Sequence, residues 1–205
     1  MMEKLDKYWD EQHLKYNSTY DGWLNKYTNL FEKSDVIIEL GCGRAYCSNY
    51  LLKNGFYHVV ACDFSEEVLK IVTTENSNLK TMLFDMSLGL PFKNNSINAI
   101  VADLSLHYFS SSTTKYILDE IYRVLKNNGY LIGRVNSTKD KFHIPNNAQK
   151  LEKNFYYDGN IYKKFFEKDD FEVLFTNFKI CNIEEKYIDR YEKSKLVWEF
   201  CIKKL

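Results

Sequence analysis

The stretch Val36-Ile37-Ile38-Glu39-Leu40-Gly41-Cys42-Gly43 decides the fold of this 205-residue chain. Its first five residues form a short, almost continuous apolar run, which is typical of a strand that is covered on both faces in a parallel sheet. The two glycines permit a tight turn and a close approach of the backbone to a ligand. A helix that runs to about Asn54 and is closed by Gly55 completes a strand–turn–helix unit.

The same unit recurs along the chain. Further strands are predicted over 58–63, 79–84, 97–102 and 130–135, and further helices are predicted after an N-cap at Ser65 and over 114–126. Strands that alternate with helices indicate an α/β fold in which a doubly wound parallel sheet carries helices on both faces. The order of the elements therefore places the carboxyl ends of these strands, where ligands bind in such sheets, along one edge.

The two ends of the chain and one internal segment depart from this unit. The first 34 residues show two amphipathic helical stripes, and residues 137–166 fit no period, so we expect an irregular insertion there. After a helix over 167–176, two strands at 178–187 and 196–202 are separated by only about eight residues. That gap is too short for a parallel crossover, so we expect seven strands with an antiparallel C-terminal strand.

The composition excludes several classes of protein. Lys+Arg and Asp+Glu are both 28, so bulk electrostatics do not favour nucleic-acid binding. No run approaches the roughly 18 apolar residues of a membrane span, and residues 1–10 lack the apolar core of a secretory signal. Five cysteines without a CxxC pair, and histidines without ligand spacing, predict no metal site and a cytoplasmic location.

The predicted strand ends carry acidic residues. Asp63 ends the second predicted strand, twenty residues after Gly43. A carboxylate at this position can accept hydrogen bonds from both hydroxyls of a ribose. At the next strand end, Asp85 could accept from an exocyclic amine, and the Met86 thioether could cover a purine. The dinucleotide-binding motif G-x-G-x-x-G is not matched, because Tyr46 occupies the position of its third glycine. The sequence also contains no P-loop motif.

These motifs, in this order, resemble the class I S-adenosylmethionine-dependent methyltransferases, which have a Rossmann-like sheet. The resemblance covers roughly residues 35–136 by motif and most of the chain by element order. Its motifs are Glu39-x-Gly41-x-Gly43, Asp63, Asp85, the stretch 102–108 and the stretch 121–132. Departures occur at Ala45, Asn98 and Asn128, none of which is expected to touch the cofactor. The C-terminal region resembles the small stand-alone methyltransferases of the tellurite-resistance or thiopurine-modifying kind.

The resemblance implies S-adenosyl-L-methionine as cofactor and S-adenosyl-L-homocysteine as product. Glu39, Gly41 and Gly43 are then expected to hold the methionine part, Asp63 the ribose, and Asp85 with Met86 the adenine. The full set of expected cofactor residues is Glu39, Gly41, Cys42, Gly43, Asp63, Phe64, Asp85, Met86, Asp103 and Leu104. Residues 1–34 are expected to form a helical lid on a methyltransferase domain over 35–205, the whole being a single domain.

Catalytic residues are harder to assign, because methyl transfer needs positioning and desolvation more than acid–base chemistry. His107 and Asp103 are weak catalytic candidates, and a pocket-lining role for His107 is the alternative. The candidates for contact with substrate or lid are Trp9, Tyr16, Tyr20, His107 and Tyr108. We expect a small-molecule acceptor, methylated at O, N, S or a metalloid, and a monomer or homodimer. An RNA or protein methyltransferase, or a non-enzymatic cofactor-binding scaffold, remain alternatives.

Overall fold

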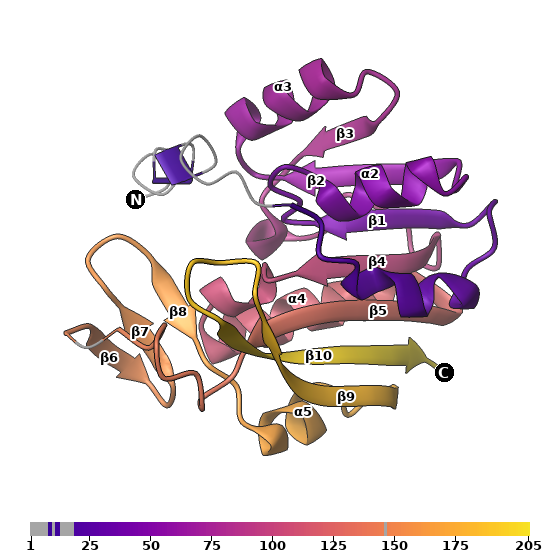
Figure 1. The fold of residues 1–205 in the computed structure, drawn as a ribbon. Helices are drawn as coiled ribbons and strands as arrows, with labels where there is room; N and C mark the ends of the chain where they lie inside the picture. Colours follow the sequence, from indigo (N-terminus) through magenta and orange to yellow (C-terminus); the bar gives the residue numbers. More distant parts are fainter. Residues whose placement is uncertain (1–7, 10, 13–18, 146) are drawn as a thin grey trace.

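The computed structural model describes residues 8–9, 11–12, 19–145 and 147–205. A seven-stranded sheet in the order β3-β2-β1-β4-β5-β10-β9 organises the fold (Figure 1). Its strands are β1 (Val36–Leu40), β2 (His58–Asp63), β3 (Lys80–Leu83), β4 (Ile97–Asp103), β5 (Leu125–Asn136), β9 (Phe178–Ile188) and β10 (Lys195–Lys204). The helical segments are η1 (Trp23–Leu30), α2 (Tyr46–Lys53), α3 (Glu66–Glu75), η2 (Met86–Leu88), η3 (Leu106–Tyr108), α4 (Ser111–Val124) and α5 (Lys168–Leu174).

Strand directions confirm the predicted topology. The strands β3, β2, β1, β4 and β5 pair in parallel, whereas β10 runs antiparallel to both β5 and β9. The β9–β10 connection is a hairpin, as the short gap required. Because β10 starts where β5 ends, the β9–β10 turn lies at the edge formed by the carboxyl ends of the parallel strands (Figure 1).

The insertion expected to be irregular contains a second sheet, so that prediction was wrong. Strands β6 (Gln149–Glu152), β7 (Phe155–Tyr157) and β8 (Tyr162–Lys164) form an antiparallel three-stranded sheet. Positive φ angles at Asn154 (58°) and Gly159 (99°) mark the places where the chain reverses. Strands of three or four residues are too short to display a hydrophobic period, so turn residues such as these were the available signal.

The N-terminal region differs in part from the prediction of two helices. Residues 8–9 and 11–12 are helical, but most of the first predicted helix lies outside the described residues. The second is a 3-10 helix, η1, whose buried face consists of Trp23, Leu24 and Tyr27. Residue spacing alone did not distinguish this tighter helix from an α-helix, since both bring residues three apart onto one side.

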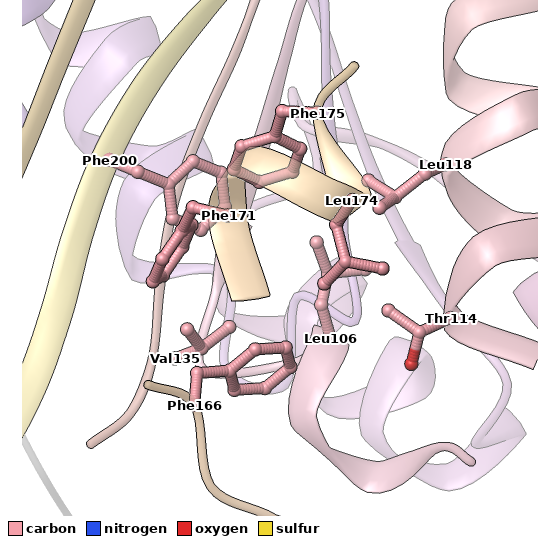
Figure 2. A pocket seen from close by; sticks show the side chains of 9 residues that line it. All are labelled: Leu106, Thr114, Leu118, Val135, Phe166, Phe171, Leu174, Phe175 and Phe200. Atoms are coloured by element: carbon pink, nitrogen blue, oxygen red, sulfur yellow. The ribbon is translucent and has the colours of Figure 1, made fainter. Parts of the chain in front are cut away.

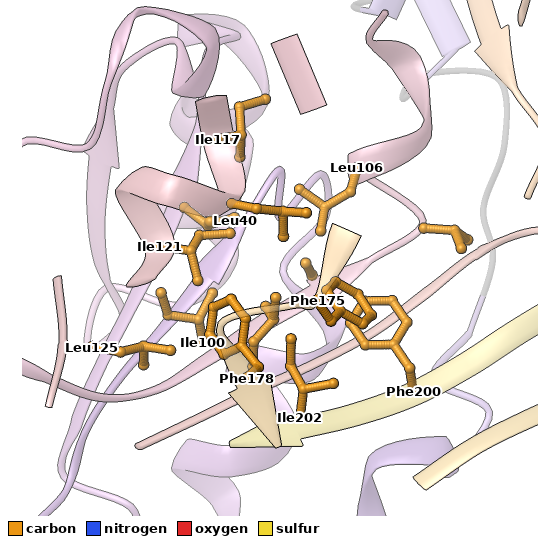
Figure 3. Packing of buried hydrophobic residues seen from close by; sticks show 14 of the residues in the cluster. Leu40, Ile100, Leu106, Ile117, Ile121, Leu125, Phe175, Phe178, Phe200 and Ile202 are labelled. Atoms are coloured by element: carbon orange, nitrogen blue, oxygen red, sulfur yellow. The ribbon is translucent and has the colours of Figure 1, made fainter. Parts of the chain in front are cut away.

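Apolar side chains cover both faces of the sheet. On one face α4 and α5 bury residues such as Ile117, Ile121 and Phe175 against Ile100 and Phe200 (Figure 3). On the other face η1, α2 and α3 pack on β1, β2 and β4. Each fully buried residue of this size contributes about 1.5–3 kcal/mol relative to an exposed one. The sheet is therefore a rigid base for the loops at its carboxyl edge.

A narrow apolar cavity lies between α4, α5 and the sheet, and it is not a ligand site (Figure 2). Its volume of about 10 Å³ is at the lower limit for one water molecule. Its single polar lining residue is Thr114, whose Oγ1 has no hydrogen-bond partner within the described part of the chain. The remaining lining residues are Leu106, Leu118, Val135, Phe166, Phe171, Leu174, Phe175 and Phe200.

A buried ion network joins four parts of the fold. The Arg134 side chain on β5 is fully buried, and it donates from Nε to Asp103 Oδ1 (2.7 Å) and from Nη2 to Oδ2 (2.9 Å). Its Nη1 donates to Asp21 Oδ2 (2.6 Å), and its guanidinium lies 4.6 Å from the Trp23 ring centroid. From the β9–β10 turn, Arg190 Nη1 also donates to Asp103 Oδ2 (2.6 Å).

The network holds Asp103 as a carboxylate. Burial opposes its ionisation, but the charges and hydrogen bonds of Arg134 and Arg190 outweigh this effect and lower the carboxyl pKa below its ordinary value. Breaking one partner of a buried ion pair is costly, because the opposite charge stays buried without compensation.

We expect Arg134→Met to lower the free energy of unfolding by about 3–5 kcal/mol, because Asp103 and Asp21 then lose their shared cation. Urea unfolding followed by circular dichroism measures this change. The control is Lys115→Met, which removes a solvent-exposed pair with Asp119 and should cost less than about 1 kcal/mol. Equal effects of the two substitutions would contradict a stabilising role for the network.

Candidate functional site

The glycine turn after β1 forms the centre of the candidate site. It closes through a hydrogen bond from the Ala45 N–H to the Cys42 carbonyl (2.8 Å), and Gly41 and Gly43 have φ angles of 63° and 50°. A Cβ at Gly41 would lie 2.5 Å from the Ser105 Cβ, a separation that atoms do not tolerate. Only glycine therefore fits where this turn meets the end of β4.

Glu39 anchors the helix that follows the turn. Its buried Oε2 accepts from both the backbone N–H (2.8 Å) and the Oγ (2.6 Å) of Ser48 in the first turn of α2. Burial raises the pKa of Glu39 to about 7, although the hydrogen bonds from Ser48 act in the opposite direction. The structure thus shows Glu39 fixing α2 relative to β1, behind the glycine turn.

Asp63 joins two loops at the end of β2. Its Oδ2 accepts from the Gly43 N–H (2.9 Å), and its Oδ1 accepts from the Ser65 N–H (3.0 Å). Ser65 in turn caps α3 by accepting from the Val68 N–H (3.1 Å). Phe64, which lies between Asp63 and Ser65 in the sequence, is half-buried. The buried Asp63 carboxylate therefore faces the glycine turn.

Asp85 and Met86 follow the end of β3, and Met86 approaches the same turn. The Asp85 Oδ1 accepts from the Ser87 N–H (2.8 Å) and starts the short η2 helix. A Cβ at Gly41 would lie 3.4 Å from the Met86 methyl carbon. The structure thus brings Met86 against the turn that β1 and β2 build.

At the end of β4 the backbone is unusual. Leu104 has a φ of 57°, a left-handed conformation that costs a residue with a side chain about 1–3 kcal/mol and persists where the surroundings impose it. Its N–H donates to the Arg134 carbonyl (3.0 Å), and the next residue, Ser105, donates from Oγ to the Leu40 carbonyl (2.6 Å). Asp103, which accepts from two arginines, is a structural ion rather than a proton acceptor.

His107 lies in an aromatic cluster on η3. Its ring centroid is 4.3 Å from that of Tyr108, and the Tyr108 ring lies 4.8 Å from Trp9 of the N-terminal segment. His107 is 1% exposed, and its Nδ1 has no hydrogen-bond partner among the residues that the structure describes. Burial, then the charges of Lys195 and Lys163, lower the imidazole pKa well below its ordinary value. The imidazole is therefore neutral near pH 7.

Of the other two N-terminal aromatic candidates, the structure describes Tyr20 but not Tyr16. Tyr20 stacks on Tyr50 of α2 with ring centroids 4.6 Å apart, and its hydroxyl donates to Asn25 Oδ1 (2.8 Å). Burial raises its phenol pKa. Tyr16 lies outside the described residues.

Sequence reasoning missed four basic residues at this edge: Arg134, Arg190, Lys163 and Lys195. None belongs to a motif, and each is placed by strand pairing between segments far apart in the chain. Over the described ranges there is no group of three His, Cys, Asp or Glu side chains arranged to hold a metal ion. Among the helices described, none is long and apolar enough to cross a membrane.

Comparison with known proteins identifies the domain. Residues 38–133 match the family model of the methyltransferase domain. A mitochondrial arginine hydroxylase of Homo sapiens is 33% identical over 98 residues, which are 48% of this chain and 28% of that protein. Phosphoethanolamine N-methyltransferase 1 of Zea mays is 29% identical over 165 residues, 78% of this chain and 32% of that protein. The chain thus spans about a third of the length of these relatives.

The fold matches solved structures over nearly its whole length. A SAM-dependent methyltransferase of Methanosarcina mazei superposes with a TM-score of 0.76 at 20% identity, covering 92% of this chain and 99% of that one. Residues 38–133 thus match a methyltransferase domain, and the topology around them is the fold of that SAM-dependent methyltransferase.

Proposed function

We propose that this chain transfers the methyl group of S-adenosyl-L-methionine to a small-molecule acceptor, at O, N, S or a metalloid, and releases S-adenosyl-L-homocysteine. The observation that supports this most directly is the meeting of three strand ends at one glycine turn. Asp63 accepts a hydrogen bond from the Gly43 N–H. Met86 and Ser105 both pack against Gly41. A backbone loop with an acid and a thioether beside it suits a nucleoside bearing an amino acid chain.

Each residue at the turn has a distinct proposed role. Gly41 and Gly43 bring bare backbone to the methionine part, with Cys42 between them. Asp63 accepts the ribose hydroxyls, which is compatible with its bonds to the turn because a carboxylate can accept about four hydrogen bonds. Asp85 accepts from the adenine amine, and Met86, with Phe64 and Leu104, lines the purine and the sulfur. The list of proposed contacts is thus the one that the sequence indicated, apart from Glu39 and Asp103.

Glu39 and Asp103 are proposed to act through other residues. Glu39 fixes α2, and so holds the glycine turn in place, through Ser48. Asp103 fixes the end of β4 through Arg134 and Arg190. S-Adenosylmethionine itself supplies the reactive methyl carbon and the thioether leaving group. The protein's own contribution is to orient the acceptor in line with that carbon and to exclude water.

We further propose that residues 1–34 are a lid over the domain formed by 35–205. Two contacts support this: the Trp9 ring lies against Tyr108 on η3, and Asp21 accepts from the buried Arg134. Tyr108 follows the end of β4, and Arg134 lies near the end of β5, so both contacts are at the carboxyl edge of the sheet. A segment docked there would separate the reacting groups from solvent.

Two alternatives to a small-molecule methyltransferase, an RNA or protein methyltransferase and a non-enzymatic cofactor-binding scaffold, lead to different expectations. An RNA or protein acceptor would require a basic groove, whereas the chain is neutral overall. A cofactor-binding scaffold would bind S-adenosylmethionine without turnover, and the match to a protein named as a hydroxylase shows that relatives of this domain have been assigned other chemistry. Transfer of radioactive methyl from the cofactor to a panel of small acceptors, tRNA and peptides separates the three.

Asp63→Asn should weaken S-adenosylmethionine binding by about 10- to 100-fold, because a charged acceptor of two ribose hydrogen bonds is lost while the side-chain volume is kept. Isothermal calorimetry measures the affinity. The control Asp35→Asn, at a half-buried residue just before β1 and at the opposite end of that strand from the glycine turn, should leave it unchanged. Unchanged affinity in Asp63→Asn with an unchanged melting temperature would remove the central support for the cofactor site.

His107 should line the pocket as a neutral imidazole and should not titrate near its ordinary pKa of 6.5, because burial lowers its pKa well below that value. NMR of the imidazole C–H resonances, assigned with His107→Asn, tests this directly. A titration midpoint near or above 6.5 would instead favour the general-base hypothesis.

Deletion of residues 1–20 should leave cooperative unfolding intact but weaken cofactor binding and turnover, because the proposed lid no longer excludes water. Trp9→Ala in the full-length chain tests the same contact, and Trp9→Phe, which keeps a ring beside Tyr108, is its matched control. Normal turnover in the truncated chain would show that the segment is no lid. If the truncated chain unfolds, the N-terminal aromatic residues belong to the core.

A further inference from the structure

The start of β10 places Lys195 beside the proposed transfer site. In the antiparallel pair, Val197 is opposite Asn136, the last residue of β5, so Lys195 lies just beyond the carboxyl end of that strand. The β9–β10 turn and the three-stranded sheet both lie on this side of the molecule (Figure 1). The topology therefore brings two late segments of the chain to the edge where methyl transfer is proposed.

A second lysine reaches the same edge from β8. This strand is fixed to the end of β5, because Asn136 Nδ2 donates to the Lys164 carbonyl (3.3 Å). It is also fixed to the start of α4, because Lys164 Nζ donates to Ser111 Oγ (2.7 Å). Successive side chains of a strand point to opposite faces, so Lys163 points away from the buried Lys164. The Lys163 ammonium donates to Asp158 Oδ2 (3.4 Å), and solvent screens this pair because both side chains are partly exposed.

Lys195 has no acidic partner within ion-pair distance among the residues that the structure describes. Its half-buried ammonium lies 5.3 Å from the Tyr191 ring centroid. Asp140, whose charge favours the ammonium form, accepts instead from His143 Nδ1 (2.9 Å) and the Leu196 N–H (3.3 Å). Burial, followed by the charge of Lys163, lowers the Lys195 pKa to about 8. Lys195 thus has no ion-pair partner among the described residues, although the charges of Asp140 and Asp103 favour its ammonium form.

His107 connects this pair of lysines to the glycine turn. It lies on η3, two residues after Ser105, which packs against Gly41 and donates to the Leu40 carbonyl. Strand β8, which carries Lys163, contacts η3, and the charges of both lysines lower the pKa of the His107 imidazole. The buried Nδ1 has no partner within the described part of the chain. Asp103, the nearest acid in sequence, is already bound to two arginines.

We infer that Lys195 and Lys163 form an anion-binding subsite next to His107, and that the methyl acceptor carries a compact anionic group, a carboxylate or a phosphate, which occupies it. This inference rests on the methyl transfer proposed above and adds the chemical class of the acceptor. The anion supplies the ion-pair partner that Lys195 lacks among the described residues, and its oxygens accept from both ammonium groups. A neutral imidazole beside it either donates to the anion or lines the path to the methyl carbon, without competing for a proton.

The test uses the full-length protein saturated with S-adenosyl-L-homocysteine at pH 7, where Lys195 is charged. The probes are acetate, inorganic phosphate and neutral acetamide, followed through the His107 imidazole resonances. We expect saturable shifts with acetate or phosphate at midpoints at least tenfold below any with acetamide. Lys195→Gln and Lys163→Gln should each raise these midpoints about tenfold or more, and Lys195→Arg should restore binding.

A matched control lies on the same strand. Lys203→Gln removes an identical charge near the opposite end of β10, where Lys203 pairs with Tyr130 at the start of the β5 ladder, and it should change nothing. The stronger probe decides between a carboxylate and a phosphate. If Lys195→Gln fails to fold, Lys163→Gln, in a partly exposed position, carries the same test.

The outcomes separate this inference from the proposed function. Normal S-adenosyl-L-homocysteine binding, with anions no better than acetamide or with both lysine variants unaffected, overturns the anion subsite and leaves the methyltransferase proposal standing. Failure to bind S-adenosyl-L-homocysteine at all overturns the proposed function and, with it, this inference.

Discussion

The buried guanidinium of Arg134 is the constraint on which the site depends. One side chain, with no contact to solvent, holds the end of β4 through Asp103 and the N-terminal segment through Asp21, and Arg190 of the β9–β10 turn binds the same Asp103. An isolated buried charge is unfavourable, so each member requires the others to be in place. Segments more than a hundred residues apart are thereby fixed relative to one another at the carboxyl edge.

A second, smaller constraint acts between the first and fourth strands. Ser105 donates to the Leu40 carbonyl and leaves no room for a side chain at Gly41. The left-handed Leu104 immediately before it is held by the backbone of Arg134. The glycine turn is therefore shaped from outside as well as by its own residues, and the two constraints meet within three consecutive residues, 103–105.

Most of the parallel sheet could be predicted from the sequence, because apolar runs, turn glycines and helix caps are local signals. The positions of Asp63 and Met86 beside the turn followed from the rule that parallel strands end at one edge. The small sheet over 149–164 was missed because its strands are too short to show a period. Arg190 and Lys195 were missed for another reason: their role arises from the pairing of β10 with β5, and long-range pairing leaves no mark on neighbouring residues. The sequence also could not distinguish a carboxylate that binds ligand from one, such as Asp103, that is bound by arginines.

The position of β10 between β5 and β9 bears on how the molecule assembles during synthesis. The strands that surround the glycine turn, β1, β2, β3 and β4, are translated first, and the strands with which they pair all lie before residue 137. The half that carries Arg190 and Lys195 cannot join the sheet until β10, the last strand in chain order, has left the ribosome and inserted between two strands already made. A chain emerging at about 5–20 residues per second would thus spend several seconds with the first half able to order and the second half unpaired. During that interval the exposed edge of β5 is the part of the nascent chain most open to wrong strand pairing.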